Sequence, residues 1–330
     1  MWYSMTTMNY RDKEKRRILS LLGDGKLIAD SGNGKMGDHN YQFALCNPQL
    51  NLWDDIRDEA INYFHQNRIK WWKWREPHDD TPTRHLLSSQ VACVNHLFPI
   101  RQNKYLATAI LKGLDSEVEC AVELDGGYVA FEFIGSDIPS LLHEGSKGAF
   151  TRGAQCTSVD AAMIASLKSG GKRLFLIEWK YTEKYPCGHN LLTKKPERGK
   201  RYNQLIESDD SPFVQDIPSE AYYFEPFYQM MRQTLFGWQS MKLGDKGISS
   251  YKNVHVIPEQ NTDLRQKITS THLRDKFHNQ SLHDVWLRCL KNKTLFIGTT
   301  PEALLSPVRG MNASQTFWSY LEERYWKSKW

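Results

Sequence analysis

The feature that most constrains the fold of this chain is an apolar run that ends in two opposite charges. Leu174 to Ile177 are consecutive apolar residues, and Glu178, Trp179 and Lys180 follow directly. Such a run between glycine-containing turns predicts a strand that is buried on both faces. Because side chains alternate along a strand, Glu178 and Lys180 leave one face while Trp179 leaves the other. The sequence therefore predicts an acid and a base side by side at the end of a buried strand.

A single acid stands in a second apolar segment. Asp160 follows Val159 and precedes five small or apolar residues, 161–165. A lone buried carboxylate is costly unless it is paired or bound to a metal. If Asp160 lies on the neighbouring strand, its charge and that of Glu178 at about 4 Å repel by roughly 4 kcal/mol at an effective dielectric of about 20. A hard cation would remove that cost, and oxygen ligands of this kind suit Mg²⁺ or Mn²⁺. The competing interpretation of residues 178–180 is an ordinary solvated Glu-x-Lys pair.

These residues resemble the catalytic signature of the restriction-endonuclease-like, PD-(D/E)XK superfamily of nucleases. Ser158-Val159-Asp160 is followed 18 residues later by Glu178-Trp179-Lys180, with Val159 where the superfamily name has proline. More narrowly, Ser88-Ser89-Gln90, Asn95-His96-Leu97-Phe98-Pro99 and residues 178–183 are similar to a little-characterised family of prokaryotic restriction-endonuclease-like proteins. The resemblance covers roughly residues 50 to 305.

The resemblance implies an α/β fold, with a mixed central β-sheet flanked by helices in a restriction-endonuclease-like core. It implies a deoxyribonuclease, an endonuclease of restriction, defence or DNA processing, that hydrolyses phosphodiester bonds by attack of a metal-activated water. Asp160 and Glu178, helped by the carbonyl of Trp179, would bind Mg²⁺, for which Mn²⁺ could substitute, and Lys180 would be the catalytic lysine. DNA is the implied partner, and a homodimer is expected because double-strand cutters of this fold often pair two subunits. The alternative is a protein of the same fold that binds DNA or recruits a partner without cutting.

Three further polar residues are candidates for the same site. Gln90 lies on a helix predicted over 85–98 whose apolar residues occupy both faces, so it is either a core amide or a group that reaches the metal-bound water. Glu132 lies in the alternating segment 128–133 and is either a further carboxylate near the metal or an edge-strand charge, with the edge charge favoured. Glu183 matches a recurrent family position, and the residues themselves give it no role.

Two segments are candidates for contact with DNA. A helix predicted over 226–242 carries Gln229, Arg232 and Gln233 on one side; Gln229 and Arg232 are candidates to touch phosphate, and a solvated polar stripe is the alternative. A basic loop after the catalytic strand could neutralise phosphates, or could simply be solvated. Its candidate residues are Lys194, Lys195, Arg198, Lys200 and Arg201.

Residues 68–75 interleave basic residues with three tryptophans. Tryptophans at this density are predicted to pack against the core, because the preceding helix presents apolar residues at helical spacing. Stacking on nucleic-acid bases is the alternative function of this segment.

Composition is consistent with a globular enzyme. The net charge is +5, from 43 basic and 38 acidic residues, which is mild for a nucleic-acid coat protein. Six cysteines without paired spacing indicate reduced thiols, and no apolar stretch reaches membrane-span length, so a cytoplasmic location and no membrane partner are expected. Residues 1–50 are predicted to be a polar, glycine-rich arm, and residues 51–330 a nuclease domain that ends in C-terminal helices. Within that domain, residues 184–219 are predicted to be a loop beside the substrate.

Overall fold

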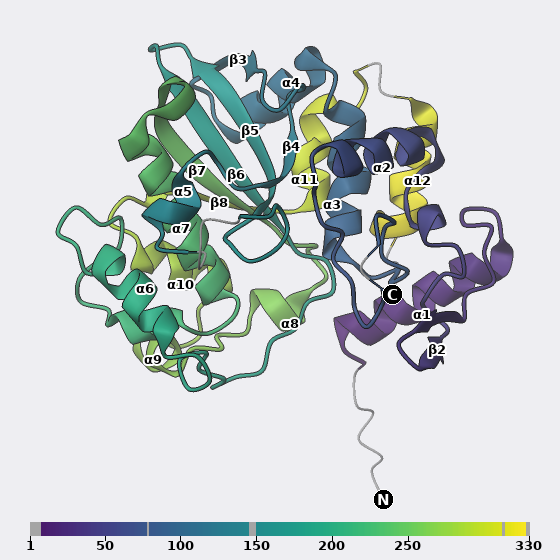
Figure 1. Ribbon diagram of the computed structural model, residues 1–330, viewed down its shortest axis with the longest axis horizontal. Helices are drawn as coiled ribbons and strands as arrows, with labels where there is room; N and C mark the ends of the chain where they lie inside the picture. Colours follow the sequence, from purple (N-terminus) through teal and green to yellow (C-terminus); the bar gives the residue numbers. More distant parts are fainter. Residues whose placement is uncertain (1–7, 78, 145–149, 312–313, 328–330) are drawn as a thin grey trace, which may run out of the picture.

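A six-stranded sheet forms the centre of the protein (Figure 1). The computed structural model describes residues 8–77, 79–144, 150–311 and 314–327. The order along the sheet is β3-β5-β6-β7-β8, and β4 pairs with β5. The strands are β3 (Val118–Val122), β4 (Ala130–Phe133), β5 (Val159–Leu167), β6 (Lys172–Trp179), β7 (Ile248–Val256) and β8 (Phe296–Thr299), and a separate hairpin consists of β1 (Gly34–Met36) and β2 (His39–Tyr41).

The sheet is mixed. The strands β3, β4 and β6 each lie antiparallel to a neighbour, β5, whereas β6, β7 and β8 run parallel to one another. Glycines at positions 170 and 171 take positive φ angles of 87° and 78° and allow the tight turn from β5 to β6. The predicted α/β fold with a mixed central sheet is confirmed.

Helices cover both faces of this sheet (Figure 1). One layer contains α2, α3, α4, α11 and α12, and the opposite layer contains α5, α6, α7, α9 and α10. The helices are α1 (Tyr10–Asp24), α2 (Arg57–Gln66), α3 (Ser89–Leu97), α4 (Lys104–Leu114), α5 (Ile138–Leu141), α6 (Glu197–Ile206), α7 (Phe227–Leu243), α8 (Thr262–Arg265), α9 (Thr271–Lys276), α10 (Leu282–Cys289), α11 (Pro301–Leu305) and α12 (Gln315–Leu321).

The central strand β6 supplies apolar side chains to both layers. Phe175, Ile177 and Trp179 pack into the core beneath α3 and α4. Leu174 and Leu176 pack into the core beneath α7 and α10. This alternation is the one predicted for a strand covered on both faces, and it sends Glu178 to the α7 side of the sheet.

The helices that border the site have local signals at their ends. The side chain of Ser88 caps α3 by accepting a hydrogen bond from the backbone N–H of Val91. Helix α7 ends at Gly244, whose φ of 66° permits a left-handed cap. The helices predicted over 85–98 and 226–242 therefore form within these segments, with α3 starting later than expected.

Two segments differ from the sequence-based expectation. The predicted loop over 184–219 contains α6, because Tyr202 and Ile206, four residues apart, give this segment a buried apolar stripe. The segment predicted as a polar arm contains the 15-residue helix α1. Ile18 and Leu22 of α1 are buried in the core, so this part of the N-terminal segment packs onto the body of the protein.

Candidate active site

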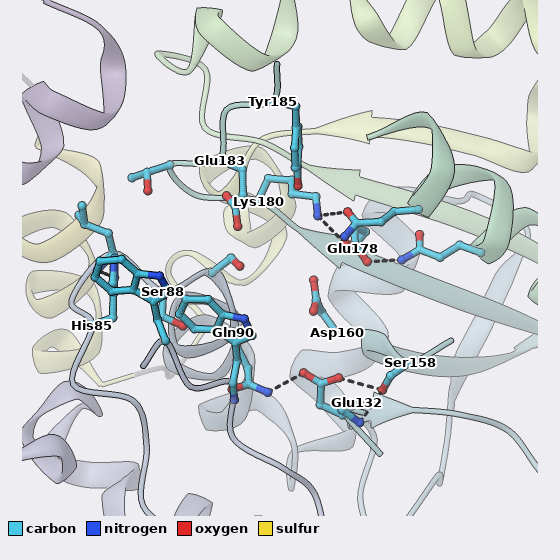
Figure 2. A pocket seen from close by; sticks show the side chains of 18 of the residues that line it. His85, Ser88, Gln90, Glu132, Ser158, Asp160, Glu178, Lys180, Glu183 and Tyr185 are labelled. Atoms are coloured by element: carbon cyan, nitrogen blue, oxygen red, sulfur yellow. Dashed lines mark hydrogen bonds and ion pairs between the residues drawn. The ribbon is translucent and has the colours of Figure 1, made fainter. Parts of the chain in front are cut away.

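A cavity of about 580 Å³ opens where β5 begins and β6 ends, beside α3 and α7 (Figure 2). Its wall brings together residues that are distant in the sequence. The side chains singled out above that line it are Gln90, Glu132, Asp160, Glu178, Lys180, Glu183, Gln229 and Arg232.

Asp160 and Glu178 stand on adjacent strands. In the antiparallel register of β5 and β6, Ala161 faces Ile177, and Asp160 and Glu178 are the next residues of the two strands. Figure 2 shows Asp160 between Glu178 and Glu132. The placement of Asp160 beside the Glu178 strand is the arrangement on which the predicted metal site depended.

The carboxyl group of Asp160 is held in a place that disfavours its charge. Its Oδ2 atom accepts a 2.7 Å hydrogen bond from the backbone N–H of Trp179. Burial, followed by the negative charges of Glu178 and Glu132, raises the pKa of Asp160 well above its ordinary value. A nearby cation would reverse this effect.

Glu132 is a third carboxylate of the site. It is only 7% exposed, so it does not project to solvent as the favoured edge-charge interpretation expected. Its φ of 47° is rare for a residue with a side chain. Its Oε1 atom accepts a 2.6 Å bond from Gln90 and its Oε2 atom a 2.8 Å bond from Ser158 (Figure 2). Burial raises the pKa of Glu132, and the charge of Glu178 adds to this effect.

Gln90 is a buried amide that links two parts of the site. Its Nε2 atom donates to Glu132 and also, at 3.1 Å, to the carbonyl of Lys70. Its Oε1 atom accepts a 2.8 Å hydrogen bond from the backbone N–H of Trp72. The side chain is therefore a satisfied core amide that also borders the cavity, and its contact with a metal-bound water stays a prediction.

Lys180 lies next to Glu178. Its Nζ atom is 2.6 Å from Oε1 of Glu178, and it also donates to Oε1 of Gln229. Burial opposes the charge of this lysine, but the combined attraction of Glu178 and of neighbouring groups, among them Glu183 and Asp160, raises the pKa of Lys180 well above its ordinary value. The other carboxylate oxygen of Glu178 accepts a hydrogen bond from Gln233. An ordinary solvated surface pair is thereby excluded, since the two side chains are only 4% and 9% exposed.

Helix α7 holds the acid and the base in place. Gln229 and Gln233, one turn apart, bind Lys180 and Glu178 respectively. Arg232 donates from Nε to Thr157 Oγ1 at 2.9 Å, and it also lies 3.4 Å from Oε1 of Glu144. The predicted solvated stripe is wrong for this helix face. Gln229 and Arg232 bind protein groups at the cavity wall, and their contact with phosphate stays a prediction.

Two other predicted residues lie close to the site. Glu183 borders the cavity and accepts a 2.6 Å hydrogen bond from the backbone N–H of Tyr181. The ring of Trp179 is buried on the far side of the sheet, 4.6 Å from the ring of His96 of α3. The role of the Trp179 carbonyl in metal binding stays a prediction.

The basic residues predicted to bind DNA are not brought into the cavity. Arg198, Lys200 and Arg201 lie on α6 rather than on a loop, and Lys194 and Lys195 precede that helix. The guanidinium of Arg198 lies 4.9 Å from the centre of the Tyr228 ring. In the part of the chain that the structure describes, these five side chains do not line the cavity. Their contact with DNA stays a prediction.

The tryptophans of residues 68–75 differ in their surroundings, and core packing and base stacking were the two interpretations of this segment. Trp71 is buried and stacks on Phe64, with ring centroids 3.8 Å apart. Trp72 is 48% exposed, and both Trp72 and Trp74 border the cavity. The prediction of core packing is therefore confirmed for Trp71 and does not describe Trp72.

The contribution of α1 to the site was not predicted from the sequence. Arg11 borders the cavity, and Glu14 accepts a 2.7 Å hydrogen bond from the hydroxyl of Tyr181, the residue after Lys180. Arg17 donates to Glu14 at 2.8 Å. The basic composition of this segment was visible, but its position depends on contacts with residues more than 160 positions away.

Hard oxygen donors make the site suitable for a divalent cation. Three carboxylates face one another, and the raised pKa of Asp160 reflects its burial first and their repulsion second. Within the described ranges, no group of three or more His, Cys, Asp and Glu side chains is arranged so that together they could hold a metal ion. Mg²⁺ does not require such a set, because it commonly binds one or two carboxylates together with waters and substrate phosphates. The donor set therefore fits Mg²⁺.

The chain belongs to the family described as restriction endonuclease associating with ARP. Its residues 28–326 match that family, which is nearly the whole chain. No curated protein and no solved structure matches the sequence. Among the described residues, none of the helices has the length and apolar character needed to cross a membrane.

Proposed function

We propose that this protein is a nuclease of the PD-(D/E)XK type that hydrolyses phosphodiester bonds in DNA and depends on Mg²⁺, which Mn²⁺ could replace. The observation that carries the proposal is the buried grouping of Asp160, Glu178 and Lys180 at the ends of two adjacent strands. Membership of a restriction-endonuclease family supports it independently.

The carboxylates would hold the cation. Asp160 and Glu178 are the proposed ligands, with the Trp179 carbonyl as a third donor and Glu132 close enough to influence the charge of Asp160. When bound, the cation would neutralise charge on the phosphate and lower the pKa of water. Its positive charge would also remove the repulsion that raises the pKa of Asp160.

Lys180 would act on the attacking water or on the phosphate. Its ammonium is charged, because Glu178 raises its pKa, and it is therefore a hydrogen-bond donor rather than a base. The Oε1 atom of Gln229 accepts a hydrogen bond from the Lys180 ammonium and so fixes the direction of that ammonium. A donor held in this way stabilises negative charge as the water oxygen bonds to phosphorus and the bond to the leaving sugar oxygen breaks.

The neighbouring helix would position these groups rather than react. Gln233 donates to Glu178, which restrains that carboxylate on the side away from Lys180. Arg232 is bound to Glu144 and Thr157, so its positive charge is fixed near the cavity wall. A preorganised charge costs no reorganisation when a phosphate enters.

The test is cleavage of supercoiled plasmid in Mg²⁺, in Mn²⁺ and in EDTA by the wild type, Asp160→Ala and Glu119→Ala. Glu119 is exposed on β3, at the opposite end of β5 from Asp160, and is the matched control. We expect cleavage that requires the cation, is lost in Asp160→Ala and is retained in Glu119→Ala. Failure of the wild type to cut plasmid or single strands in either metal would refute the proposal and favour a DNA-binding or partner-recruiting role.

A further inference from the structure

One exposed aromatic side chain borders the carboxylate site. Trp72 is 48% exposed, whereas its neighbour Trp71 is 4% exposed. Trp72 lines the same cavity as Asp160 and Glu178. An indole left half-exposed in a polar cavity presents apolar surface that gains from being covered by a flat partner. The mechanism proposed above does not use it.

The backbone of Trp72 is tied to the catalytic groups by consecutive hydrogen bonds. Its N–H donates to Gln90 Oε1 at 2.8 Å, and Gln90 Nε2 donates to Glu132 Oε1 at 2.6 Å. The other oxygen of Glu132 accepts a 2.8 Å bond from Ser158, two residues before Asp160. Because each donor and acceptor is fixed, the backbone at Trp72 keeps a constant position relative to the site where phosphate would bind.

The surroundings of Trp72 suit a nucleobase. His85 contacts both tryptophans edge-on, with its ring centroid 6.0 Å from Trp72 and 5.8 Å from Trp74. Burial, followed by the charge of Arg11, lowers the pKa of His85 to about 4, so the His85 ring is uncharged at neutral pH. Arg11 itself borders the cavity and supplies a cation that could meet the phosphate attached to a stacked base.

We propose that Trp72 stacks on an unpaired base of the DNA strand that is cut, so that the substrate is single-stranded DNA or a duplex opened next to the cleaved bond. This inference rests on the proposed nuclease function. Within a duplex, both faces of each base are covered by its neighbours, so a protein ring can stack only on a base that has left the stack. A cavity of about 580 Å³ falls within the range of about 300–1,000 Å³ that holds one small molecule, which is the scale of a nucleotide.

Binding without cleavage tests the inference. A 5′-fluorescein-labelled single strand and its duplex are titrated in EDTA with the wild type, Trp72→Ala, Trp72→Phe and Tyr105→Ala. Tyr105 is a matched control, because it is 72% exposed and lies on α4 away from the cavity. We expect the wild type to prefer the single strand. Trp72→Ala should weaken single-strand binding by about 5- to 100-fold, while Trp72→Phe retains most of it and Tyr105→Ala all of it.

A base-stacking probe distinguishes stacking from a structural effect. 2-Aminopurine is placed at successive positions of the single strand, and its fluorescence is read on binding. Quenching at a restricted position in the wild type, which is lost in Trp72→Ala, is the expected result. Equal loss of single-strand and duplex binding in Trp72→Ala, or no loss of either, would overturn the inference.

The two proposals fail in different ways. If Trp72-dependent single-strand binding is found but the wild type cuts no DNA in Mg²⁺ or Mn²⁺, the nuclease proposal is wrong and the stacking site stands. If the wild type cuts DNA but Trp72→Ala binds and cuts single strands as well as the wild type does, the stacking site is wrong and the nuclease stands.

Discussion

The ammonium of Lys180 lies 2.6 Å from Oε1 of Glu178, and both side chains are buried at the end of β6. Each charge is therefore compensated mainly by the other, with Gln229 and Gln233 completing the hydrogen bonds. A buried pair of this kind is expensive to break, because the remaining charge loses its partner without gaining water. The same contact that would serve catalysis thus also contributes to the stability of the site.

Replacing Lys180 should reduce both activity and stability. We expect Lys180→Ala to lower single-turnover cleavage by about 10²- to 10³-fold, the effect of removing one donor to the transition state, with DNA binding largely retained. Loss of the partner of Glu178 should lower the free energy of unfolding by about 3–5 kcal/mol in EDTA. Stopped-flow cleavage and urea denaturation measure the two effects. Lys168→Ala, at an exposed turn residue, is the control, and unchanged turnover in Lys180→Ala would remove Lys180 from the mechanism.

Replacing Asp160 by asparagine should separate activity from stability. The raised pKa of Asp160 means that the folded protein disfavours its charge. An amide oxygen can still accept the bond from the Trp179 N–H, so Asp160→Asn should abolish cation-dependent cleavage yet raise the free energy of unfolding in EDTA by about 0.5–2 kcal/mol. Thermal unfolding with and without Mg²⁺ is the measurement. Lower stability than the wild type in EDTA would contradict this account of the site.

The pH dependence of stability should also show that the folded protein disfavours the charge of Asp160. The folded-state pKa values of Asp160 and Glu132 lie above the ordinary values of 3.8 and 4.5. The folded protein therefore binds these protons more tightly than the unfolded chain does. The resulting stabilisation of the fold is complete at pH below the ordinary pKa values, and it is lost as pH rises through the folded-state pKa values. In EDTA, the stability of the wild type relative to Asp160→Asn should fall as pH rises above about 4.

Chemical denaturation across a pH series, with and without saturating Mg²⁺, measures this difference. Cation binding to the ionised carboxylates should cancel the fall, because it stabilises the charged form. Glu119→Gln, which changes an exposed carboxylate, should follow the wild type at every pH. A constant difference between the wild type and Asp160→Asn over the whole series would show that the charge of Asp160 is not disfavoured in the fold.

The basic residues near α6 should affect affinity without affecting the fold. Lys194, Lys195 and Lys200 are exposed, and their replacement by glutamine removes charge without uncovering the core. If they contact phosphates, the triple variant should bind DNA more weakly, and the slope of log affinity against log salt should fall by about 0.9 for each lost contact. Fluorescence anisotropy at several salt concentrations gives the slope. The matched double variant of Lys104 and Lys112 on α4 should keep the wild-type slope, and an unchanged slope in the triple variant would place DNA elsewhere.

The central grouping could be predicted because it depends on strand geometry alone. Alternation along a buried strand places Glu178 and Lys180 on one face, and an isolated acid among apolar residues made Asp160 a candidate for the neighbouring strand. The structure places Asp160 and Glu178 next to each other in the antiparallel register. Local periodicity was therefore sufficient for Glu178 and Lys180, whereas the pairing of the Asp160 strand with theirs was a condition that the structure meets.

The rest of the site depends on features with little local signal. Glu132 turns toward Gln90 from a backbone with positive φ, which a glutamate rarely adopts and which strand alternation does not predict. Arg11 reaches the cavity only because α1 docks against distant segments. For α6, the spacing of Tyr202 and Ile206 was an available helical signal, but the many basic residues around it suggested a loop.

The docking of α1 also determines the order in which the parts of the site form during synthesis of the chain. Glu14 binds the hydroxyl of Tyr181, and Arg17 donates to the backbone carbonyls of Glu323 and Arg324. A ribosome adds roughly 5–20 residues per second, so the first helix of the chain must wait many seconds for its last partners to be synthesised. The wall that carries Arg11 is therefore among the last parts of the cavity to close. A nascent chain would carry the acids of the site before the cavity around them is complete.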